Sequence, residues 1–324
     1  MKKSKTLAIV MDPIHTIKPH KDTSLALLLA FQRAEYQIFY LERQDLEIRA
    51  GRACGHAQEL RVADDSEQWY SFTSSQSTCL ELGSLDIVLM RLDPPVDSDF
   101  HMCLQILDLA EKQGALVVNR PASIMRFNEK LLASHFPEHV AHSLVSQRKA
   151  SLSEFVNARQ MSILKPLDGM GGMGIFKVAQ DDANLDVIIE QLTHYGRDKI
   201  MAQTFMPEIK DGDKRILLID GEPVPYALAR IPSAGKTRGN IAAGGTGRPQ
   251  PLSDQDWKIA AAVGPYLKAH GLIFVGLDVI GDKITEVNVT SPTCAREIDR
   301  AYDTKIGALL VTAAERLLKS QRSS

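Results

Sequence analysis

The chain has 324 residues, of which 44% are apolar and 24% are charged, and its formal net charge is −2. These values are typical of a globular protein with two or three domains, and they argue against a basic nucleic-acid-binding domain. The longest apolar run, Leu25–Phe31, is far shorter than the roughly 20 residues that cross a bilayer. The four cysteines have no Cys-x-x-Cys spacing, so no zinc or redox motif is visible. We therefore expect a cytosolic protein without nucleic-acid or membrane partners.

The first part of the chain has the pattern of an α/β domain with a parallel sheet. Short apolar runs predict strands at residues 7–11, 37–41, 85–90 and 115–118. Helices are predicted to follow the first and third strands, at about residues 23–34 and 99–112. Strands that alternate with helices favour a parallel sheet. The polar residues 47–80 are expected to form a hairpin and a loop.

From about residue 161 the pattern changes to antiparallel strands. The turns Asp220-Gly221 and Gly281-Asp282 each join two apolar runs and predict hairpins. Further strands are expected at residues 161–165, 175–178 and 200–204, with helices near 184–195, 253–270 and 305–319. We therefore predict an α/β domain over residues 1–122, followed by α+β modules with antiparallel sheets over 123–204 and 205–324.

A glycine-rich loop follows the strand that ends at Lys165. It contains Gly169, Gly171, Gly172 and Gly174. Glycines allow backbone N–H groups to approach an anion closely, and a lysine adds a positive charge for a phosphate. Neither G-x-x-x-x-G-K-[ST] nor G-x-G-x-x-G before a helix is present. The pattern predicts a phosphate-binding loop of another kind; the alternative is a flexible hairpin tip.

Three oxygen-bearing side chains fall on the last predicted hairpin. Glu286 and Asn288 are two residues apart, so they project from one face of a strand, and the hairpin brings Asp278 beside them. Carboxylates within apolar strands cost free energy unless they are paired or bind a metal. Together they predict a site for a hard cation, and Mg²⁺ with substrate phosphates is its natural occupant. The alternative is the polar face of a half-solvated hairpin.

Basic residues surround the neighbouring hairpin. Arg215 and Arg230 lie on its two strands, where their guanidinium groups could bind a phosphate or a carboxylate. The stretch 231–248 is rich in glycine and in basic residues and has no apolar periodicity. We interpret it as a mobile loop that closes over anions and excludes water. The alternative is a disordered linker.

Considered together, these blocks resemble the bacterial glutathione synthetases of the ATP-grasp superfamily. The resemblance rests on the segments 11–13, 90–95, 128–130, 165–172, 210–215, 221–225, the stretch 231–248 and 286–293, in the order of that family. It implies a pre-ATP-grasp domain at residues 1–122, a central lid-like ATP-grasp module at 123–204, and a catalytic ATP-grasp module at 205–324 with its mobile loop.

The resemblance also implies a reaction, in which ATP, γ-glutamylcysteine and glycine give glutathione, ADP and phosphate through an acyl phosphate. Two Mg²⁺ ions, for which Mn²⁺ would substitute, a cytoplasmic location and a homotetramer are implied as well. The implied roles are ATP binding by Lys130, Lys165, Gly169, Gly171, Gly172, Gln203 and Asp213; catalysis by Arg215, Arg230 and Arg238; metal binding by Asp278, Glu286 and Asn288; and substrate binding by Asn288, Ser291 and Thr293.

Three other functions fit parts of the sequence. A ligase that joins D-alanines, or adds glutamate to a peptide, would share the ATP and metal residues but differ in the segment 288–293. A regulatory protein that binds ATP without turnover could retain the same residues. A dinucleotide-binding module is disfavoured, because Met11-Asp12-Pro13 stands after the first strand in place of a glycine fingerprint.

Overall fold

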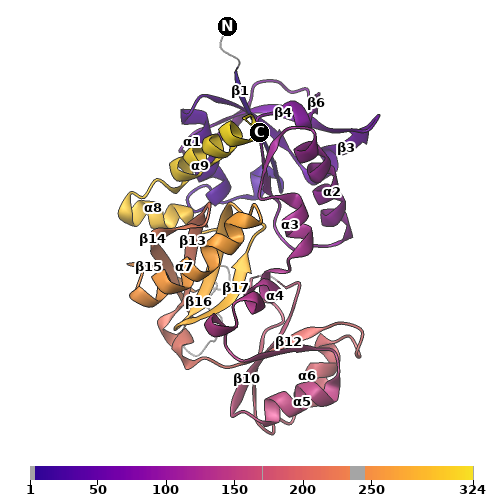
Figure 1. Ribbon diagram of the computed structural model, residues 1–324, viewed down its shortest axis with the longest axis vertical. Helices are drawn as coiled ribbons and strands as arrows, with labels where there is room; N and C mark the ends of the chain where they lie inside the picture. The colour runs from indigo at the N-terminus through magenta and orange to yellow at the C-terminus, as the bar shows by residue number, and fades with distance from the viewer. Residues whose placement is uncertain (1–3, 170, 234–244, 324) are drawn as a thin grey trace.

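The computed structural model describes residues 4–169, 171–233 and 245–323. The strands of these residues form three sheets that follow one another along the long axis of the molecule (Figure 1). A mixed sheet lies at the top, a five-stranded antiparallel sheet in the middle, and a four-stranded antiparallel sheet at the bottom. The predicted fold class, an α/β domain followed by α+β modules, is confirmed. In the described part of the chain, no helix combines the length and the apolar character needed to cross a membrane.

The amino-terminal sheet has the strand order β3-β4-β2-β1-β7-β8. Strands β2, β1, β7 and β8 are parallel neighbours, and helical crossovers join β1 to β2 and β7 to β8. Asp22 and Asp97 cap the first turns of α1 and α2 by accepting hydrogen bonds from Leu25 and Phe100. The elements are β1 (Lys5–Met11), α1 (Thr23–Arg33), β2 (Tyr36–Leu41), β7 (Ile87–Arg91), α2 (Ser98–Lys112), β8 (Leu116–Val118) and α3 (Pro121–Arg126).

The segment 47–80 contains more strand structure than the expected hairpin and loop. It holds β3 (Leu46–Arg49), β4 (Arg52–Val62), β5 (Tyr70–Phe72) and β6 (Thr78–Glu81). The long strand β4 pairs with β2, β3, β5 and β6, all antiparallel. Ala53 and Ala57 of β4 pack into one core and Leu60 and Val62 into another, and polar residues such as His56 and Gln58 stand between them. This shallow alternation of small and polar residues explains why the sequence pattern was weak.

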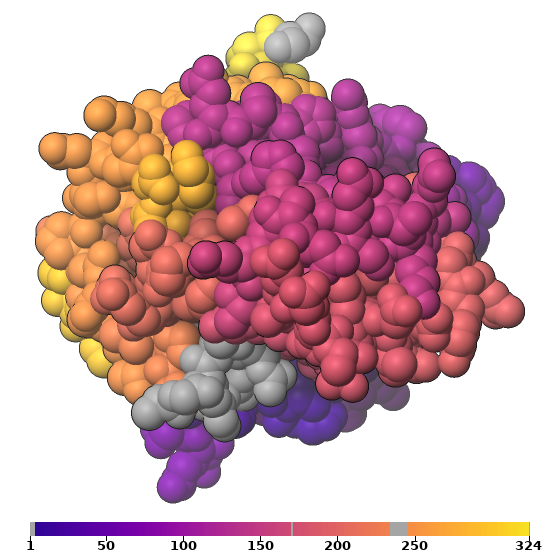
Figure 2. Space-filling view, turned by 90° about the horizontal axis from the view of Figure 1, so that it is seen from below, coloured from indigo at the N-terminus to yellow at the C-terminus, as the bar shows by residue number. Residues whose placement is uncertain are grey.

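The four-stranded sheet lies at the end of the molecule, in the order β11-β10-β12-β9. Its two helices pack against one face, where Leu152, Leu164 and Ile189 form a small core of their own. From below, residues of this module cover the centre of the surface, and parts of residues 205–270 lie to its left (Figure 2). The elements of this region are α4 (Glu129–Leu132), β9 (Ser143–Ser146), α5 (Lys149–Asn157), β10 (Met161–Pro166), β11 (Phe176–Ala179), α6 (Leu185–Leu192) and β12 (Ile200–Thr204).

The middle sheet has the order β15-β14-β13-β16-β17, and all its neighbours are antiparallel. Strand β15 includes residues 246–248, which the sequence assigned to a mobile loop; in the structure they pair with β14. Helix α8 was not expected. The elements are β13 (Asp213–Ile219), β14 (Glu222–Ile231), β15 (Thr246–Pro251), α7 (Asp254–Ala269), β16 (Phe274–Ile280), β17 (Lys283–Asn288), α8 (Ala295–Tyr302) and α9 (Ile306–Gln321).

The last helix returns to the amino-terminal sheet. Helix α9 packs along α1 (Figure 1), where Ala30 and the backbone of Ala26 approach Gly307 so closely that a side chain there would clash. One apolar core therefore includes residues of β1, α1, β13, β14 and α9. The top and middle sheets are joined by buried apolar surface as well as by the chain itself.

Asn119 makes a polar connection between these two sheets. It is 2% exposed and directly follows β8. Its amide nitrogen donates to the carbonyls of Phe274 (2.8 Å) and Val289 (2.7 Å), and its oxygen accepts from the N–H groups of Ile273 (2.7 Å) and Phe274 (2.8 Å). One side chain thus satisfies four buried backbone groups at the starts of β16 and the segment after β17.

We expect Asn119→Ala to lower the free energy of unfolding by about 3 kcal/mol or more, because it leaves buried backbone groups without partners. Urea unfolding would measure this loss. Asn157→Ala, at the exposed end of α5, is the matched control and should change stability by less than about 0.5 kcal/mol. Equal stability of the two variants would show that Asn119 does not join the sheets.

Candidate active site

Two pockets meet between the middle and the four-stranded sheets. They enclose about 860 and 1020 Å³ of space, including solvent at their mouths. Both are lined by Gly169, Gly171, Asp278 and Glu286. Because these residues belong to both walls, a group bound in one pocket can reach a group bound in the other. A transfer between two bound molecules would take place here.

The first pocket has an apolar wall and a cationic end. Side chains that the sequence analysis did not single out form the apolar wall, and they come from both sheets: Ile163, Ile175, Phe205, Met206, Ile209 and Ile280. Such a wall suits a flat aromatic ring. At the other end lie Lys130, Lys165 and the glycine loop. The pocket therefore suits a ligand with an aromatic base and a chain of phosphates.

Both lysines are buried and held in place. Lys130 Nζ donates to the carbonyl of Gly169 (2.7 Å) and to Glu286 Oε1 (2.9 Å). Lys165 Nζ donates to Gln203 Oε1 (3.3 Å) and to the carbonyl of Thr285 (3.4 Å). Burial lowers the pKa of Lys165 to about 8, and the charge of Lys130 acts in the same direction although Glu286 opposes it. An anion between the two lysines would relieve their repulsion.

The glycines of the loop have conformations that other residues rarely adopt. Gly171 has a φ of 62° and Gly172 a φ of 79°. Gly169 lies close to Pro166, whose ring a β-carbon at this position would meet at 2.9 Å. The loop can therefore bring backbone N–H groups toward the pocket only with glycine at these positions.

Two arginines and Asp278 form a buried charge cluster on the middle sheet. Arg215 Nε and Nη2 donate to the two oxygens of Asp278 at 2.6 and 3.1 Å, and Arg230 Nη2 lies 2.8 Å from Asp278 Oδ2. The strands explain this contact, because Arg215 on β13 pairs directly with Asp278 on β16. Burial would raise the pKa of Asp278, but the two guanidinium groups hold that pKa well below its usual range. Asp278 is therefore ionised.

Asp213 belongs to the same cluster, but its pKa is shifted in the opposite direction from that of Asp278. It accepts a hydrogen bond from Arg230 Nη2 at 2.5 Å, while its Oδ1 is buried without a hydrogen-bond partner. Burial raises the pKa of Asp213 to about 7, because Arg230 only partly offsets it and Asp278 competes for the same arginine. Its free oxygen and its place in the wall of the first pocket make it a candidate for binding a hydroxyl group.

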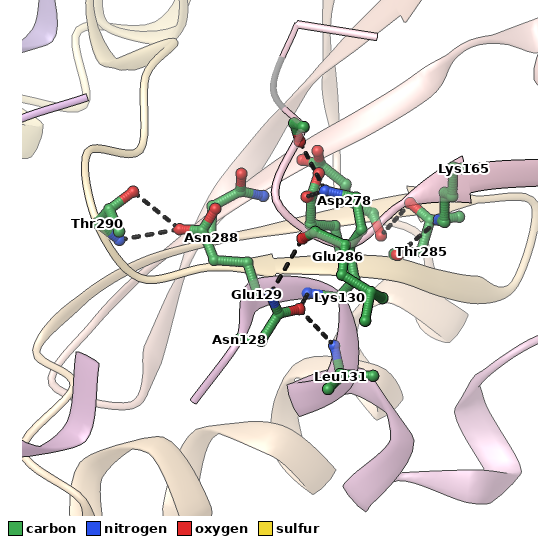
Figure 3. A network of polar contacts seen from close by, with 12 residues as sticks. Asn128, Glu129, Lys130, Leu131, Lys165, Asp278, Thr285, Glu286, Asn288 and Thr290 are labelled. Atoms are coloured by element: carbon green, nitrogen blue, oxygen red, sulfur yellow. Dashed lines mark hydrogen bonds and ion pairs between the residues drawn. The ribbon is translucent and has the colours of Figure 1, made fainter. Parts of the chain in front are cut away.

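The predicted metal ligands lie together on the last hairpin (Figure 3). Asp278 pairs with Glu286 across β16 and β17, and Asn288 follows on the same strand with its Nδ2 bound to the carbonyl of Gly276 (3.1 Å). All three line the second pocket, and they offer carboxylate and amide oxygens. This set of oxygen donors fits Mg²⁺ or another hard divalent ion. Asp278 already holds two arginines, so Glu286 and Asn288 are the more available ligands.

Glu129 is a site residue that the sequence analysis missed. It comes from α4, directly before Lys130, and accepts hydrogen bonds from Val289 N (2.8 Å) and from Thr290 N (3.0 Å) and Oγ1 (2.9 Å). Figure 3 shows its side chain extending toward Thr290, on the opposite side from Lys130. Glu129 thereby fixes the segment after β17, where Ser291 and Thr293 line the second pocket. Its position beside Lys130 is the only signal that the sequence offered.

The second pocket has walls from both ends of the chain. Lys21, Asp93 and Pro94 come from the amino-terminal domain, and Glu297 comes from α8. The predicted residues Asn288, Ser291, Thr293, Arg215 and Arg230 complete the lining. The predicted residues of the nucleotide end, Lys130, Lys165, Gly169, Gly171, Gly172, Gln203 and Asp213, line the first pocket. Arg238 lies outside the described residues, as does most of the predicted loop 231–248.

The fold is that of the ATP-grasp ligases. The chain superposes on the crystal structure of a D-cycloserine synthetase with a TM-score of 0.67, 14% sequence identity, and coverage of 96% of this chain and 99% of that one. D-alanyl-alanine synthetase A from Vibrio cholerae gives a TM-score of 0.58 and 10% identity over 97% and 99% of the two chains. At these identities the likeness shows the fold alone.

Sequence comparison narrows this class to one family. Residues 6–125 match the prokaryotic glutathione synthetase N-terminal domain, and residues 129–303 match the ATP-grasp domain of the same enzymes. The chain is 54% identical over 309 residues to the glutathione synthetase of Shewanella oneidensis, covering 95% of this chain and 98% of the relative. It is 51% identical over 315 residues to that of Escherichia coli, covering 97% and 99%. The chain belongs to the prokaryotic glutathione synthetase family.

We expect Asp278→Asn to lower the free energy of unfolding at pH 7 by about 3–5 kcal/mol, because it removes the counter-charge of the buried Arg215 and leaves the buried Arg230 with Asp213 alone. Urea unfolding would measure the loss. The pKa of Asp278 is depressed in the folded protein, so its contribution is present at neutral pH and should shrink as the pH falls below about 4.

Asp282→Asn is the matched control, since this exposed carboxylate lies in the turn of the same hairpin. It should change stability by less than about 0.5 kcal/mol at any pH. A similar small change in Asp278→Asn would contradict the role of Asp278 as the counter-charge of both arginines.

Proposed function

We propose that the protein joins glycine to γ-glutamylcysteine with ATP, through an acyl phosphate, and releases glutathione, ADP and phosphate. Besides membership of the family, the proposal rests on the pair of pockets that share Gly169, Gly171, Asp278 and Glu286. One pocket suits a nucleotide, the other suits a polar peptide, and the shared wall is where the phosphoryl group of one would meet the carboxylate of the other. The reaction uses ATP and a divalent metal ion.

At the nucleotide end, the residues position phosphates and the base. Adenine would lie against the apolar wall beside Gln203, and the free oxygen of Asp213 would accept a hydrogen bond from the ribose. Lys130, Lys165 and the backbone of Gly169, Gly171 and Gly172 would bind the phosphates. These groups are held before ATP arrives, so little reorganisation is needed on binding.

At the shared wall, the charge cluster would stabilise the phosphoryl group in transfer. Asp278 holds Arg215 and Arg230 so that both line the peptide pocket. Their positive charge would stabilise the acyl phosphate until the glycine amine attacks it and phosphate leaves. We propose Arg238 as a third cation from the loop 231–248, on the resemblance in sequence alone.

For the metal, we propose Mg²⁺, with two ions at the site and Mn²⁺ able to substitute. Asp278, Glu286 and Asn288 would hold them, and the metal would neutralise charge on the phosphates of ATP. Glu286 is held by Lys130, so the two residues would exchange partners as metal and nucleotide enter. Asn288, Ser291 and Thr293 would contact the peptide, and Glu129 would fix their segment.

Three further proposals concern the whole protein. We propose the division into residues 1–122, 123–204 and 205–324, which assigns one sheet to each part. A cytoplasmic location is supported by the four free thiols. A homotetramer is proposed from the resemblance to the family, and light scattering of the purified protein would test it.

The first test of function is phosphate release by the purified protein with ATP and Mg²⁺. Release should require γ-glutamylcysteine and glycine together, and mass spectrometry should identify glutathione. We expect Glu286→Gln to lower turnover at least about 100-fold while the protein stays folded, because a metal ligand is lost. The loss of the ion pair with the buried Lys130 should lower the stability without unfolding the chain. Asp282→Asn should keep full activity.

Release with D-alanine alone, and none with γ-glutamylcysteine and glycine, would replace the proposed substrates and leave the nucleotide pocket as assigned. Tight ATP binding without release for any pair would point to a regulatory protein. Full activity of Glu286→Gln would remove Glu286 from the metal site.

The lowered pKa of Lys165 predicts a pH dependence of nucleotide binding. Only the charged lysine attracts phosphate, and its pKa in the free protein is about 8. Above pH 8 the affinity for ATP should therefore fall by up to about tenfold per pH unit, in addition to any change near pH 7 that the titration of Asp213 causes. Isothermal titration from pH 6.5 to 9.5 would measure this.

Lys165→Arg provides the matched variant, because a guanidinium group stays charged throughout this range. Whatever its absolute affinity, it should lose the fall above pH 8. The same fall in both proteins would assign the titration to another group.

A further inference from the structure

The outer face of the amino-terminal sheet carries a cluster of metal-binding side chains that the proposed reaction does not use. Within the described residues, Glu47, His56 and Cys79 are the one group of at least three His, Cys, Asp or Glu side chains whose ligand atoms all lie within 4.8 Å of one another. None of the three lines either pocket of the active site. They therefore belong to a separate location on the molecule.

The pairing of three strands brings these residues together. His56 on β4 lies directly opposite Cys79 on β6, and Glu47 on β3 lies opposite Cys54 on β4. Cys54 and His56 are two residues apart, so they share a face of β4. The ligands are thus distant in sequence but adjacent in the sheet. This separation explains why no metal-binding spacing of cysteines or histidines is visible along the chain.

The ligand atoms of the three side chains all lie within 4.8 Å of one another, which is near the spacing in a tetrahedral metal site. His56 Nε2 lies 3.5 Å from Glu47 Oε2, and Cys79 Sγ lies 3.7 Å from Glu47 Oε1. Ligands of a tetrahedral ion are separated by about 1.6 times the bond length, which for bonds of about 2.0–2.3 Å to zinc gives about 3.3–3.8 Å. The two contacts end on different oxygens of Glu47, so an ion bound by one of these oxygens requires small side-chain movements but no change in the strands.

The chemistry of the donors selects the class of ion. A thiolate, an imidazole and a carboxylate together suit zinc and similar divalent transition metals, whereas Mg²⁺ prefers oxygen alone. We propose that Glu47, His56 and Cys79 bind one such ion, of which Zn²⁺ is the representative, and that a water occupies the fourth coordination position. Binding releases the thiol proton of Cys79 to solvent, so charge and atoms balance.

Two neighbours of the cluster have other roles. The thiol of Cys54 interacts with that of Cys79 and is buried, but it is not one of the three ligand atoms that lie within 4.8 Å of one another. Arg49 Nη2 lies 2.8 Å from Glu47 Oε1. Its side chain is 61% exposed, so moving it aside for an ion costs little. A bound ion would tie β3 to β4 and β6 and stabilise this edge of the sheet.

Titration of the untagged full-length protein with Co²⁺ would test the proposal, because tetrahedral Co²⁺ absorbs visible light and a thiolate ligand adds a charge-transfer band. The protein is kept reduced, and excess Mg²⁺ occupies oxygen sites. One equivalent of Co²⁺ should bind per chain with both spectral features, and Zn²⁺ should displace it. Zn²⁺ should also raise the melting temperature, since it binds the folded chain.

The variants Glu47→Gln, His56→Gln and Cys79→Ser should each weaken Zn²⁺ binding at least about tenfold, and Cys79→Ser should abolish the charge-transfer band. Catalytic activity and the fold should stay unchanged. Cys54→Ser is the matched thiol control. Glu81→Gln is the matched carboxylate control, because Glu81 lies opposite Cys54 on the same strands and pairs with Arg52. Both should bind as the wild type does.

Binding that all five variants retain would be adventitious and would overturn the proposal. An equal loss in Cys54→Ser or Glu81→Gln would overturn the three-residue assignment, because general thiol content or negative charge would then hold the ion. Absence of the Co²⁺ spectrum in the wild-type protein would overturn it as well.

Discussion

Two arginine side chains buried on one sheet face require a carboxylate between them, and Asp278 meets this requirement. Without it, Arg215 and Arg230 would repel each other in a region from which water is largely excluded. The ion pairs also hold the three strands β14, β13 and β16 in register around the site. Because Asp213 shares Arg230 and has a raised pKa, the cluster retains an excess of positive charge for an anion. Fold stability and anion binding depend on the same contacts.

The other groups of the site are arranged around this cluster by short polar contacts between modules. Lys130 connects the glycine loop to Glu286, and the adjacent Glu129 connects α4 to the segment after β17. Asn119 connects the amino-terminal sheet to that same region. Each contact joins residues that are far apart in the chain, so the two pockets meet at one point although their walls come from three sheets.

Much of this arrangement could be predicted from the sequence, where the signals are local. The period of two along a strand placed Glu286 and Asn288 on one face, and the hairpin turn placed Asp278 beside them. The glycines at 169–174 predicted a loop in which positive φ angles occur. The short apolar runs predicted β1, β2, β7 and β8, because buried parallel strands have that composition.

What could not be predicted depends on contacts between distant residues. Strand β4 has four partners but little apolar alternation, so its pairings leave no pattern along the chain. Helix α8 follows Cys294, whose φ of 87° is a conformation that sequence rules assign to glycine. Glu129 has no motif, and the group of Glu47, His56 and Cys79 exists only once β3, β4 and β6 have paired.

The packing of α9 on α1 has consequences for biosynthesis. A ribosome makes α1 well before α9, the helix that covers it. Until α9 is made, the apolar face of α1 has no cover, so the nascent domain cannot reach its final stability on its own. This order of synthesis couples the completion of the first domain to that of the segment that carries α9.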